Sequence, residues 1–320
     1  MKIGVLTSGG DAPGMNAVIC AIVKKATEDK IDVYGFLKGY NGLISGNFKK
    51  LNMDSVAGIV NLGGTVLQTA RCEEFLTDLG PRKAKQTYDM MALDGLIVIG
   101  GDGTFRGAVK LAELGIPCIG IPGTIDNDIA STGYTIGFDT AINTATKMID
   151  FLMDSVKSHG RCMVVEVMGR ESGKIALNTA LATGADFVLL PGGNEEQEKQ
   201  LINKIKYKKV QGKEHFLIIV AEGCQNKNTI AEKIAAETKI SVRSSVLGYV
   251  QRGGAPSAKD RIIASKMGIR AVTILKNKGK NRMIGELSGK IVDLDLKEAM
   301  NNKNSNNADD KEVEQFINSL

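Results

Sequence analysis

The sequence predicts an α/β protein built from two doubly wound, three-layer domains with mainly parallel sheets. Two observations lead to this prediction. Short apolar runs with strand character alternate with longer amphipathic segments along most of the chain, which is the pattern of parallel strands connected by helices. The chain also has 320 residues, which exceeds one ordinary domain and suggests about two.

The first part of the chain begins with a strand, a glycine-rich turn and a helix. Turn-forming residues between positions 37 and 60, among them Asn41-Gly42, suggest a hairpin in a stretch that is otherwise difficult to interpret. The expected elements are, in order, strand 3–7, turn 8–14, helix 17–30, strand 32–36, helix 81–93, strand 94–99, helix 104–114 and strand 116–121.

A long amphipathic helix starting near Thr140 is expected to lead into the second domain, where the alternation repeats. Residues 301–310 are rich in Asn, Lys and Asp and predict a loose surface segment. The expected elements are strand 162–167, helix 173–183, strand 187–190, helix 195–207, strand 216–220, helix 229–237, extended segment 241–250, turn 251–254 and helix 258–275.

The composition, with 43% hydrophobic and 24% charged residues, is that of a globular protein in water. No apolar run approaches the ~20 residues that span a bilayer, and the N-terminus enters a strand without a signal sequence, so we expect a cytoplasmic protein without a membrane partner. The five cysteines show no metal-site spacing. The lysine-rich stretch 204–209 lacks interleaved aromatic residues, so we interpret it as a solvated helix face and expect no nucleic-acid partner.

Two polar turns follow neighbouring apolar runs and carry the chemistry. The sequence GGDGT occupies residues 100–104, and PGTIDND occupies residues 122–128. Glycines let backbone N–H groups approach an anion, and a helix that follows adds the positive end of its dipole. Asp102, Asp126 and Asp128 add carboxylates that could bind Mg²⁺ or accept a proton. If residues 126–128 are extended, Asp128 would point to the same side as Asp126.

This combination predicts a phosphoryl-transfer centre, because such a reaction needs anion-binding N–H groups, Mg²⁺ and a carboxylate near the acceptor hydroxyl. The chain has no GxxxxGK[ST] sequence, which excludes a P-loop enzyme. It also lacks the strand lysine, HRD and DFG sequences of protein kinases.

Four motifs in order and spacing make the chain resemble the bacterial ATP-dependent 6-phosphofructokinases from residue 2 to about residue 285. They are GGDGT at 100–104, PGTIDND at 122–128, MGR at 168–170 and QRGG at 251–254. The resemblance implies a glycolytic kinase, a transferase that phosphorylates fructose 6-phosphate at its 1-hydroxyl, with ATP as co-substrate and Mg²⁺ as cofactor. It also implies a homotetramer, or at least a dimer, with shared active sites.

The resemblance also assigns roles to residues. Asp126 would be the catalytic base, assisted by Arg71, Thr124 and Asp128, and Asp102 would bind the metal. The ATP-contacting positions are Gly10, Arg71, Cys72, Gly101, Asp102, Gly103 and Thr104. The sugar-phosphate positions are Thr124, Asp126, Arg161, Met168, Gly169, Arg170, Glu222, Arg243, Tyr249 and Arg252. Arg161 and Arg243 match positions that reach into a neighbouring subunit's site.

The resemblance further implies two domains joined by chain crossings. The nucleotide-binding domain would comprise residues 1–138 and about 252–303, and the sugar-phosphate domain residues 139–251 and about 304–320. Gly103 and Gly123 match ATP-using members, whereas pyrophosphate-using members generally carry Asp and Lys there. A bulkier residue would fill the space that the α-phosphate of ATP needs.

The chain departs from the family pattern at three places. Tyr249 replaces a usual histidine and cannot become cationic, and Cys72 replaces a usual aromatic residue. At the effector-site positions most cations are missing, which leads to the hypothesis that ADP and phosphoenolpyruvate do not regulate this protein. These positions hold Cys20, Lys24, Met53, Met153, Asp186, Gln211 and Lys213.

Three alternatives remain open at this point. One is a pyrophosphate-dependent phosphofructokinase, and a second is a kinase of another sugar phosphate. The third belongs to a different class, a paralogue that binds nucleotide or sugar phosphate and regulates a partner without catalysis. The altered effector positions and Tyr249 motivate the third alternative, whereas the intact Asp102, Asp126 and Asp128 speak against it.

Overall fold

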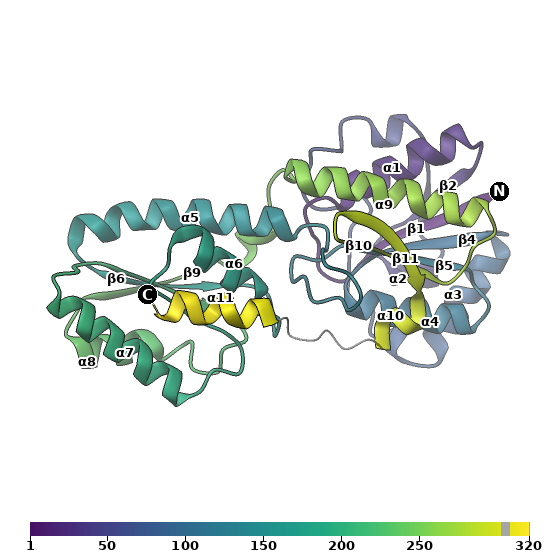
Figure 1. The fold of residues 1–320 in the computed structure, drawn as a ribbon. Helices are drawn as coiled ribbons and strands as arrows, with labels where there is room; N and C mark the ends of the chain where they lie inside the picture. Colours follow the sequence, from purple (N-terminus) through teal and green to yellow (C-terminus); the bar gives the residue numbers. More distant parts are fainter. Residues whose placement is uncertain (302–307, 320) are drawn as a thin grey trace. The chain divides into compact units, whose positions relative to one another are not determined.

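The computed structural model describes residues 1–301 and 308–319 (Figure 1). The chain divides into two compact units, and the chain passes between them more than once. Unit 1 comprises the described residues of Met1–Thr140 and Arg252–Asn304, and unit 2 those of Ala141–Gln251 and Ser305–Leu320. Each unit is built on its own sheet.

Unit 1 contains a seven-stranded sheet in the order β11-β10-β5-β4-β1-β2-β3. Its five central strands are parallel, whereas β3 and β11 run antiparallel to their neighbours at the two edges. The strands are β1 (Lys2–Ser8), β2 (Asp32–Phe36), β3 (Phe48–Leu51), β4 (Gly95–Gly100), β5 (Cys118–Pro122), β10 (Arg282–Leu287) and β11 (Lys290–Asp295).

Helices cover both faces of this sheet. Figure 1 shows α1 and α9 side by side on one face, with α3, α4 and α10 on the other. Because both faces are covered, every residue of β4 is buried, and its sequence is continuously apolar instead of alternating. The helices are α1 (Met15–Glu28), α2 (Tyr40–Ser45), α3 (Leu79–Met90), α4 (Asp102–Glu113), α9 (Ala258–Lys276) and α10 (Leu296–Asn301).

Unit 2 contains a four-stranded parallel sheet in the order β7-β8-β6-β9. Its strands are β6 (Cys162–Val167), β7 (Phe187–Leu189), β8 (Phe216–Ala221) and β9 (Val242–Val246). Helix α5 (Phe138–His159) begins in unit 1 and continues into unit 2. The other helices are α6 (Lys174–Thr183), α7 (Glu195–Val210), α8 (Ile230–Thr238) and α11 (Ala308–Ser319). Side chains of α7 and α8 form a buried apolar cluster with the strands.

Helix α11 binds to the outer edge of this sheet. The side-chain amide of Asn318 accepts a hydrogen bond from the N–H of Val188 at 2.9 Å and donates one to its carbonyl oxygen at 3.1 Å, as a neighbouring strand would. Lys204 of α7 donates to the carbonyl oxygens of Ile317 and Asp186, at 3.0 and 2.7 Å. Burial, and secondarily the charge of Lys208, lowers the pKa of Lys204 to about 8. Lys204 is therefore not part of a solvated face, unlike the sequence-based interpretation of 204–209.

The predicted α/β class with mainly parallel sheets is confirmed. The hairpin turn expected at Asn41-Gly42, between residues 37 and 60, is wrong because both residues lie inside α2. The chain reverses direction through this helix, and β3 then pairs antiparallel with β2. Gly46, in the left-handed conformation, ends α2.

The C-terminal part of the chain contains elements that the sequence analysis did not predict. The β10 and β11 hairpin and α10 follow α9. Of the loose segment predicted at 301–310, residues 302–307 lie outside the described residues, and the prediction is wrong for residues 308–310, which begin α11. Among the described helices, none is long and apolar enough to cross a bilayer.

Candidate active site

In unit 1, the carboxyl ends of three adjacent parallel strands meet. The strand register pairs Ser8 of β1 with Gly100 of β4, and Gly100 with Pro122 of β5. The N–H of Gly123 donates to the carbonyl oxygen of Gly100 at 3.0 Å, so the pairing continues into the turns. The three polar turns of the sequence therefore lie side by side at the edge where open α/β sheets bind ligands.

The first turn carries Gly10, which lies directly against Arg252. A Cβ at Gly10 would lie 1.9 Å from Nη1 of Arg252, so a larger residue would displace this side chain. The same Nη1 is 3.3 Å from the carbonyl oxygen of Asp11. The Nε atom of Arg252 is buried and has no hydrogen-bond partner within the described part of the chain. One donor of this guanidinium is thus available to an acceptor that is not part of the described chain.

The second turn places the beginning of α4 beside the first. The helix starts at Asp102, two residues earlier than predicted, with Gly101 as an extended N-cap residue. The hydroxyl of Thr104 donates to the carbonyl oxygen of Ser8 at 3.0 Å and ties the two turns together. A Cβ on Gly103 would meet no heavy atom within 4 Å, so open space lies beside this residue. The N–H groups of Thr104 and Phe105 already donate to the carbonyl oxygen of Gly101, at 3.0 and 3.2 Å. The N–H groups that precede Thr104 at the positive end of α4, with the open space beside Gly103, suit an anion.

Asp102 is the first residue of α4, and its carboxylate lies 2.7 Å from Nη2 of Arg106. The described residues contain no group of three or more His, Cys, Asp or Glu side chains that could hold a metal ion. Mg²⁺ commonly binds through one or two carboxylates together with substrate phosphates. A single half-exposed carboxylate at an anion-binding helix end fits that mode of binding.

Tyr40 supports the first turn of α4 through a hydrogen bond, a role that the sequence did not predict. Its hydroxyl donates to the carbonyl oxygen of Thr104 at 2.5 Å, and its ring stacks on Phe75 with 4.0 Å between ring centroids. Burial raises the pKa of Tyr40 well above its ordinary value, so the hydroxyl keeps its proton. A Cβ on Gly107 would lie 2.7 Å from the Tyr40 ring, so this glycine permits the close approach.

The third turn carries Thr124 and the buried Asp126, which is 1% exposed. The hydroxyl of Thr124 lies 3.3 Å from Oδ2 of Asp126 and accepts the N–H of Asp126 at 3.2 Å. The expectation for Asp128 depended on an extended segment, and this condition is not met. Residues 125–126 form a turn and Asn127 has a φ of +49°, so the alternation of side chains does not apply.

The loop with Arg71 and Cys72 is held against the same edge. The hydroxyl of Thr69 donates to the carbonyl oxygen of Gly9 at 2.7 Å. The side-chain amide of Asn41 donates to the backbone carbonyl oxygen of Arg71 at 3.2 Å. The side chain of Arg71 is exposed, whereas Cys72 is half-buried against the apolar core. Burial raises the pKa of the Cys72 thiol. The structure thus brings all the predicted nucleotide positions to one edge of unit 1.

In unit 2, a second cluster forms at the carboxyl ends of β6 and β8. Oε1 of Glu222 accepts the backbone N–H groups of Gly169 and Arg170, at 3.1 and 2.6 Å. These two residues have φ values of +127° and +49°, so the carboxylate stabilises an unusual backbone conformation. Oε1 of the fully buried Gln251 accepts the N–H of Met168 at 3.2 Å. Glu222 is thus a support for this loop, a role that the sequence did not reveal.

The remaining sugar-phosphate positions of unit 2 lie at opposite ends of its sheet. Tyr249 is 83% exposed and belongs to the short helix Gly248–Arg252 after β9, which also carries the Gln251 that contacts Met168. Arg161 precedes β6, and Arg243 pairs with Met163 near the beginning of the same strand. These two arginines therefore lie at the amino ends of the strands, about five residues (Arg243) and about seven residues (Arg161) from Met168 along β6, or roughly 16 and 23 Å. Within unit 2, the structure does not bring them to that loop.

The positions matched to the effector site fall into separate groups. Cys20 and Lys24 line a cavity of about 350 Å³ between α1, α9 and Val60. In unit 2, Asp186 is already paired with Lys213 and lies 3.6 Å from Lys208. The positive charge of Lys213 is therefore largely compensated within the chain.

Comparisons with known proteins give consistent results. The phosphofructokinase family model matches residues 2–275. An ATP-dependent 6-phosphofructokinase of Bacillus velezensis is 48% identical over 305 residues, covering 95% of each chain, and one of Clostridium tetani is 50% identical over 299 residues, covering 93% of each. The structure of phosphofructokinase from Saccharomyces cerevisiae matches with a TM-score of 0.88 and 31% identity. That match covers 99% of this chain and 48% of the yeast chain, so this chain spans about half of its length.

Proposed function

Because the chain belongs to the phosphofructokinase family, we propose that it transfers the γ-phosphoryl group of ATP to the 1-hydroxyl of fructose 6-phosphate. The products are fructose 1,6-bisphosphate and ADP. The observation that carries this proposal is the strand register that sets the GGDGT turn beside the turn with Thr124 and Asp126. A phosphate-binding helix end and a buried carboxylate then face the same edge of one sheet.

We assign the nucleotide to the first two turns of unit 1. Backbone N–H groups at Gly10, Gly101 and Gly103 would bind phosphate oxygens at the positive end of α4, and Thr104 would hold this turn in place through its hydroxyl. The exposed side chain of Arg71 would neutralise charge on the transferring group, and Cys72 would contact the nucleotide. Asp102 would hold Mg²⁺, which would neutralise negative charge on the phosphates.

We assign the base to Asp126. Its carboxylate would accept the proton of the 1-hydroxyl while that oxygen bonds to the γ-phosphorus and the bond from phosphorus to the ADP oxygen breaks. Thr124 would help to hold the hydroxyl, and Asp128 would assist at the phosphate. Burial of Asp126 excludes water from the base and fixes its position, which suits a reaction that depends mainly on geometry.

We assign the 6-phosphate to arginines, whose planar groups can donate paired hydrogen bonds to an anion. Arg170 and Arg252 would bind the phosphate from the same chain, and Tyr249 could donate a hydrogen bond to it. Met168, Gly169 and Glu222 would complete the sugar-phosphate site, Glu222 by holding the MGR loop. Arg161 and Arg243 would bind to a site in a second copy, and their place at the other end of the strands supports that division. On this proposal the active form is a homodimer or a homotetramer. The cytoplasmic location stays a prediction.

ATP is the favoured donor because of Gly103. The open space beside Gly103 leaves room for the α-phosphate, and an aspartate there would place a like charge in that space. The structure does not extend this argument to Gly123, where a Cβ would lie 3.1 Å from Cγ2 of the buried Ile99. The relatives named above carry the ATP-dependent name as well. These points favour ATP over pyrophosphate.

A coupled assay with fructose 6-phosphate and Mg²⁺, run with ATP and with pyrophosphate, tests the proposal. Turnover is expected with ATP alone and should fall by about three orders of magnitude or more in Asp126→Ser. Turnover with pyrophosphate would contradict the choice of donor. Nucleotide binding without turnover would point to another acceptor sugar or to a non-catalytic regulatory protein.

A further inference from the structure

A fully buried carboxylate outside the predicted site lies in the first turn of α9. Asp260 is 0% exposed, and its carboxylate accepts hydrogen bonds from four uncharged donors that lie more than 100 residues earlier in the chain. Oδ1 accepts the hydroxyl of Tyr134 at 2.6 Å and the N–H of Gly137 at 2.8 Å. Oδ2 accepts the N–H of Thr140 at 2.9 Å and its hydroxyl. Ser257 caps α9 and donates its N–H to the same threonine hydroxyl at 2.9 Å.

All four of these donors are on the segment 134–140, which forms the end of the loop after β5 and the beginning of α5. The carboxylate of Asp260 thus caps α5 from a different helix, at the end where a negative charge is favourable. The same carboxylate belongs to the first turn of its own helix. The chain leaves unit 1 after Thr140 and re-enters it at Arg252. Asp260 therefore connects the segment just before the exit to the helix just after the return.

The segment held by Asp260 is the second half of the loop that carries Thr124 and Asp126. The hydroxyl of Thr135 donates to the carbonyl oxygen of Thr124 at 2.6 Å. The N–H of Ile136 donates to the carbonyl oxygen of Pro122 at 2.9 Å, and Ile136 pairs with Gly123 as an isolated bridge. The position of Thr124 is therefore set from the side of residues 134–137 as well as from β5.

Packing transmits the position of this segment to the base and to the first glycine turn. Gly137 has a φ of +106°, and a Cβ there would lie 2.8 Å from Cβ of Ala12 and 3.3 Å from Cγ2 of Ile125. Ile125 directly precedes Asp126, and Ala12 belongs to the first glycine turn. No side chain fits at position 137, so Ala12 and Ile125 pack close to the backbone of Gly137, and a shift of this backbone toward them would displace both.

We propose that Asp260 is a positioning residue for phosphoryl transfer, which fixes residues 134–140 and through them Thr124 and Asp126. This inference rests on the proposed function for its kinetic consequence, but its structural part can be tested without turnover. Reactions that depend on positioning respond steeply to small displacements of the reacting groups. Loss of Asp260 should therefore lower kcat more than it weakens substrate binding.

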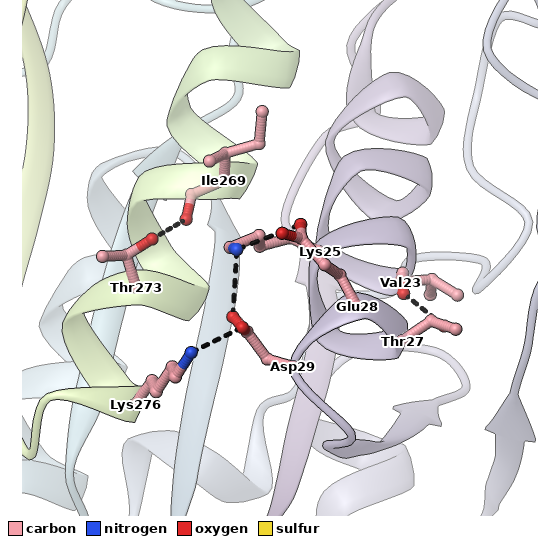
Figure 2. A network of polar contacts seen from close by, with 8 residues as sticks. All are labelled: Val23, Lys25, Thr27, Glu28, Asp29, Ile269, Thr273 and Lys276. Carbon is pink, nitrogen blue, oxygen red and sulfur yellow. Dashed lines mark hydrogen bonds and ion pairs between the residues drawn. The ribbon is translucent and has the colours of Figure 1, made fainter.

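The chain offers a matched control at the other end of α9. Asp29 follows α1, and its side chain is 7% exposed. Figure 2 shows this carboxylate between Lys276 of α9 and Lys25 of α1, at 2.5 and 3.2 Å. Asp29 thus fixes the same helix in the same unit, but it lies beyond the amino ends of the strands and contacts none of the three polar turns. Asp29→Asn changes a carboxylate to an amide, as Asp260→Asn does.

The experiment compares Asp260→Asn, Tyr134→Phe and Asp29→Asn with the wild-type chain, well below each variant's unfolding temperature. For Asp260→Asn, kcat should fall about 10- to 100-fold while both KM values change less than about three-fold. For Tyr134→Phe, which removes a single donor, kcat should fall about three-fold. For Asp29→Asn, kcat should stay within two-fold of the wild-type value.

Hydrogen exchange measured by mass spectrometry on residues 122–137 gives the second readout. This peptide should exchange faster in Asp260→Asn and Tyr134→Phe than in Asp29→Asn, whether or not the wild type turns over fructose 6-phosphate. If both site variants match Asp29→Asn in kcat and in exchange, Asp260 has only a structural role and the inference is wrong. If Asp260→Asn does not fold, Tyr134→Phe decides by the same criteria. An inactive wild type with faster exchange in the variants would contradict the proposed function and leave the structural part supported.

Discussion

The two units hold their strand-end turns in different ways. In unit 1 the three polar turns continue the register of β1, β4 and β5, and their ties are backbone pairs or threonine hydroxyls on carbonyl oxygens, as with Thr104 and Ser8. In unit 2 the MGR loop has two residues with positive φ, and a single carboxylate, Glu222, holds both of their N–H groups. Each of these contacts between the turns of unit 1 should therefore be less critical than Glu222 is for the loop of unit 2, whereas Asp260, which makes four hydrogen bonds to residues 134–140, is the counterpart of Glu222 in unit 1.

The largest effect is expected for Glu222→Ala, which removes both hydrogen bonds from the strained loop. Hydrogen bonds to a charged group contribute about 1.5–3 kcal/mol each, so the loss of both costs the loop about 3–6 kcal/mol, and KM for fructose 6-phosphate should rise about 100-fold or more. KM for ATP should stay unchanged, because the nucleotide positions are in unit 1. Steady-state kinetics with each substrate varied in turn measures the two values. Glu222→Gln, which keeps an acceptor oxygen, should have a smaller effect, and equal rises in both KM values would count against the assignment.

A smaller effect is expected for Thr104→Val, which keeps the shape of the buried side chain and removes its hydrogen bond to Ser8. The loss of one neutral hydrogen bond costs about 1 kcal/mol, so KM for ATP should rise about five-fold. The sugar KM should not change. Thr104→Ser retains the hydroxyl and is the control. A larger loss than that of Glu222→Ala would reverse the comparison between the units.

The pH dependence of stability should appear in different pH windows in the two units, an alkaline one in unit 2 and an acidic one in unit 1. In unit 2, burial lowers the pKa of Lys204 to about 8, below the ordinary value of about 10.4. Between these values the unfolded chain holds a proton that the folded chain has released, so the free energy of unfolding should rise with pH. After allowance for the solvent around this half-exposed ammonium, the change should be about 1 kcal/mol.

Urea unfolding of the wild type and of Lys204→Met at pH 7.5 and pH 9.5 measures this effect. The free energy of unfolding of the wild type, relative to that of Lys204→Met, should be higher at pH 9.5 than at pH 7.5. Lys206→Met changes a neighbouring exposed lysine of α7 and should show no such shift. A constant difference for Lys204→Met would show that this group does not titrate in the window.

The smallest effect is expected in unit 1, at Asp29. Its hydrogen bond from Lys276 is the main cause of a lowered pKa. A lowered carboxyl pKa contributes stability that is fully present above the ordinary value of about 3.9 and is lost as the pH falls through the folded value. Thermal unfolding at pH 7 and pH 3 should therefore show that Asp29→Asn destabilises the protein at pH 7 and much less at pH 3. Equal destabilisation at both values would contradict this prediction.

The parallel strands could be predicted because they are buried on both faces. Runs such as residues 96–99 and 216–220 are apolar without interruption, which is the pattern of a covered parallel sheet. The β10 and β11 hairpin lies at an edge and contains charged residues throughout, so the same criterion missed it. Its signal was the Ser288-Gly289 pair, whose φ values are +51° and +80° in the turn.

The reacting groups could be predicted from their motifs, but the groups that support them could not. Asp260 in the first turn of a helix has the pattern of an exposed, favourable charge, and only its spacing from Ser257 hints at a cap. Its partners are more than 100 residues earlier in the sequence. Tyr40 and Glu222 likewise act on backbone atoms of distant segments, and no local pattern encodes such a contact.

The docking of α11 has a consequence for folding during synthesis, because β7 is made long before the helix that covers its edge. Strand β7 lies at the edge of its sheet, and Asn318 occupies the hydrogen-bonding groups of Val188 there. During synthesis on the ribosome, residues 187–189 emerge more than 100 residues before their partner. We expect a nascent chain to carry an open sheet edge throughout this interval, and such edges invite pairing with other chains. Chaperone capture during translation should therefore concentrate on this stretch until α11 has been completed.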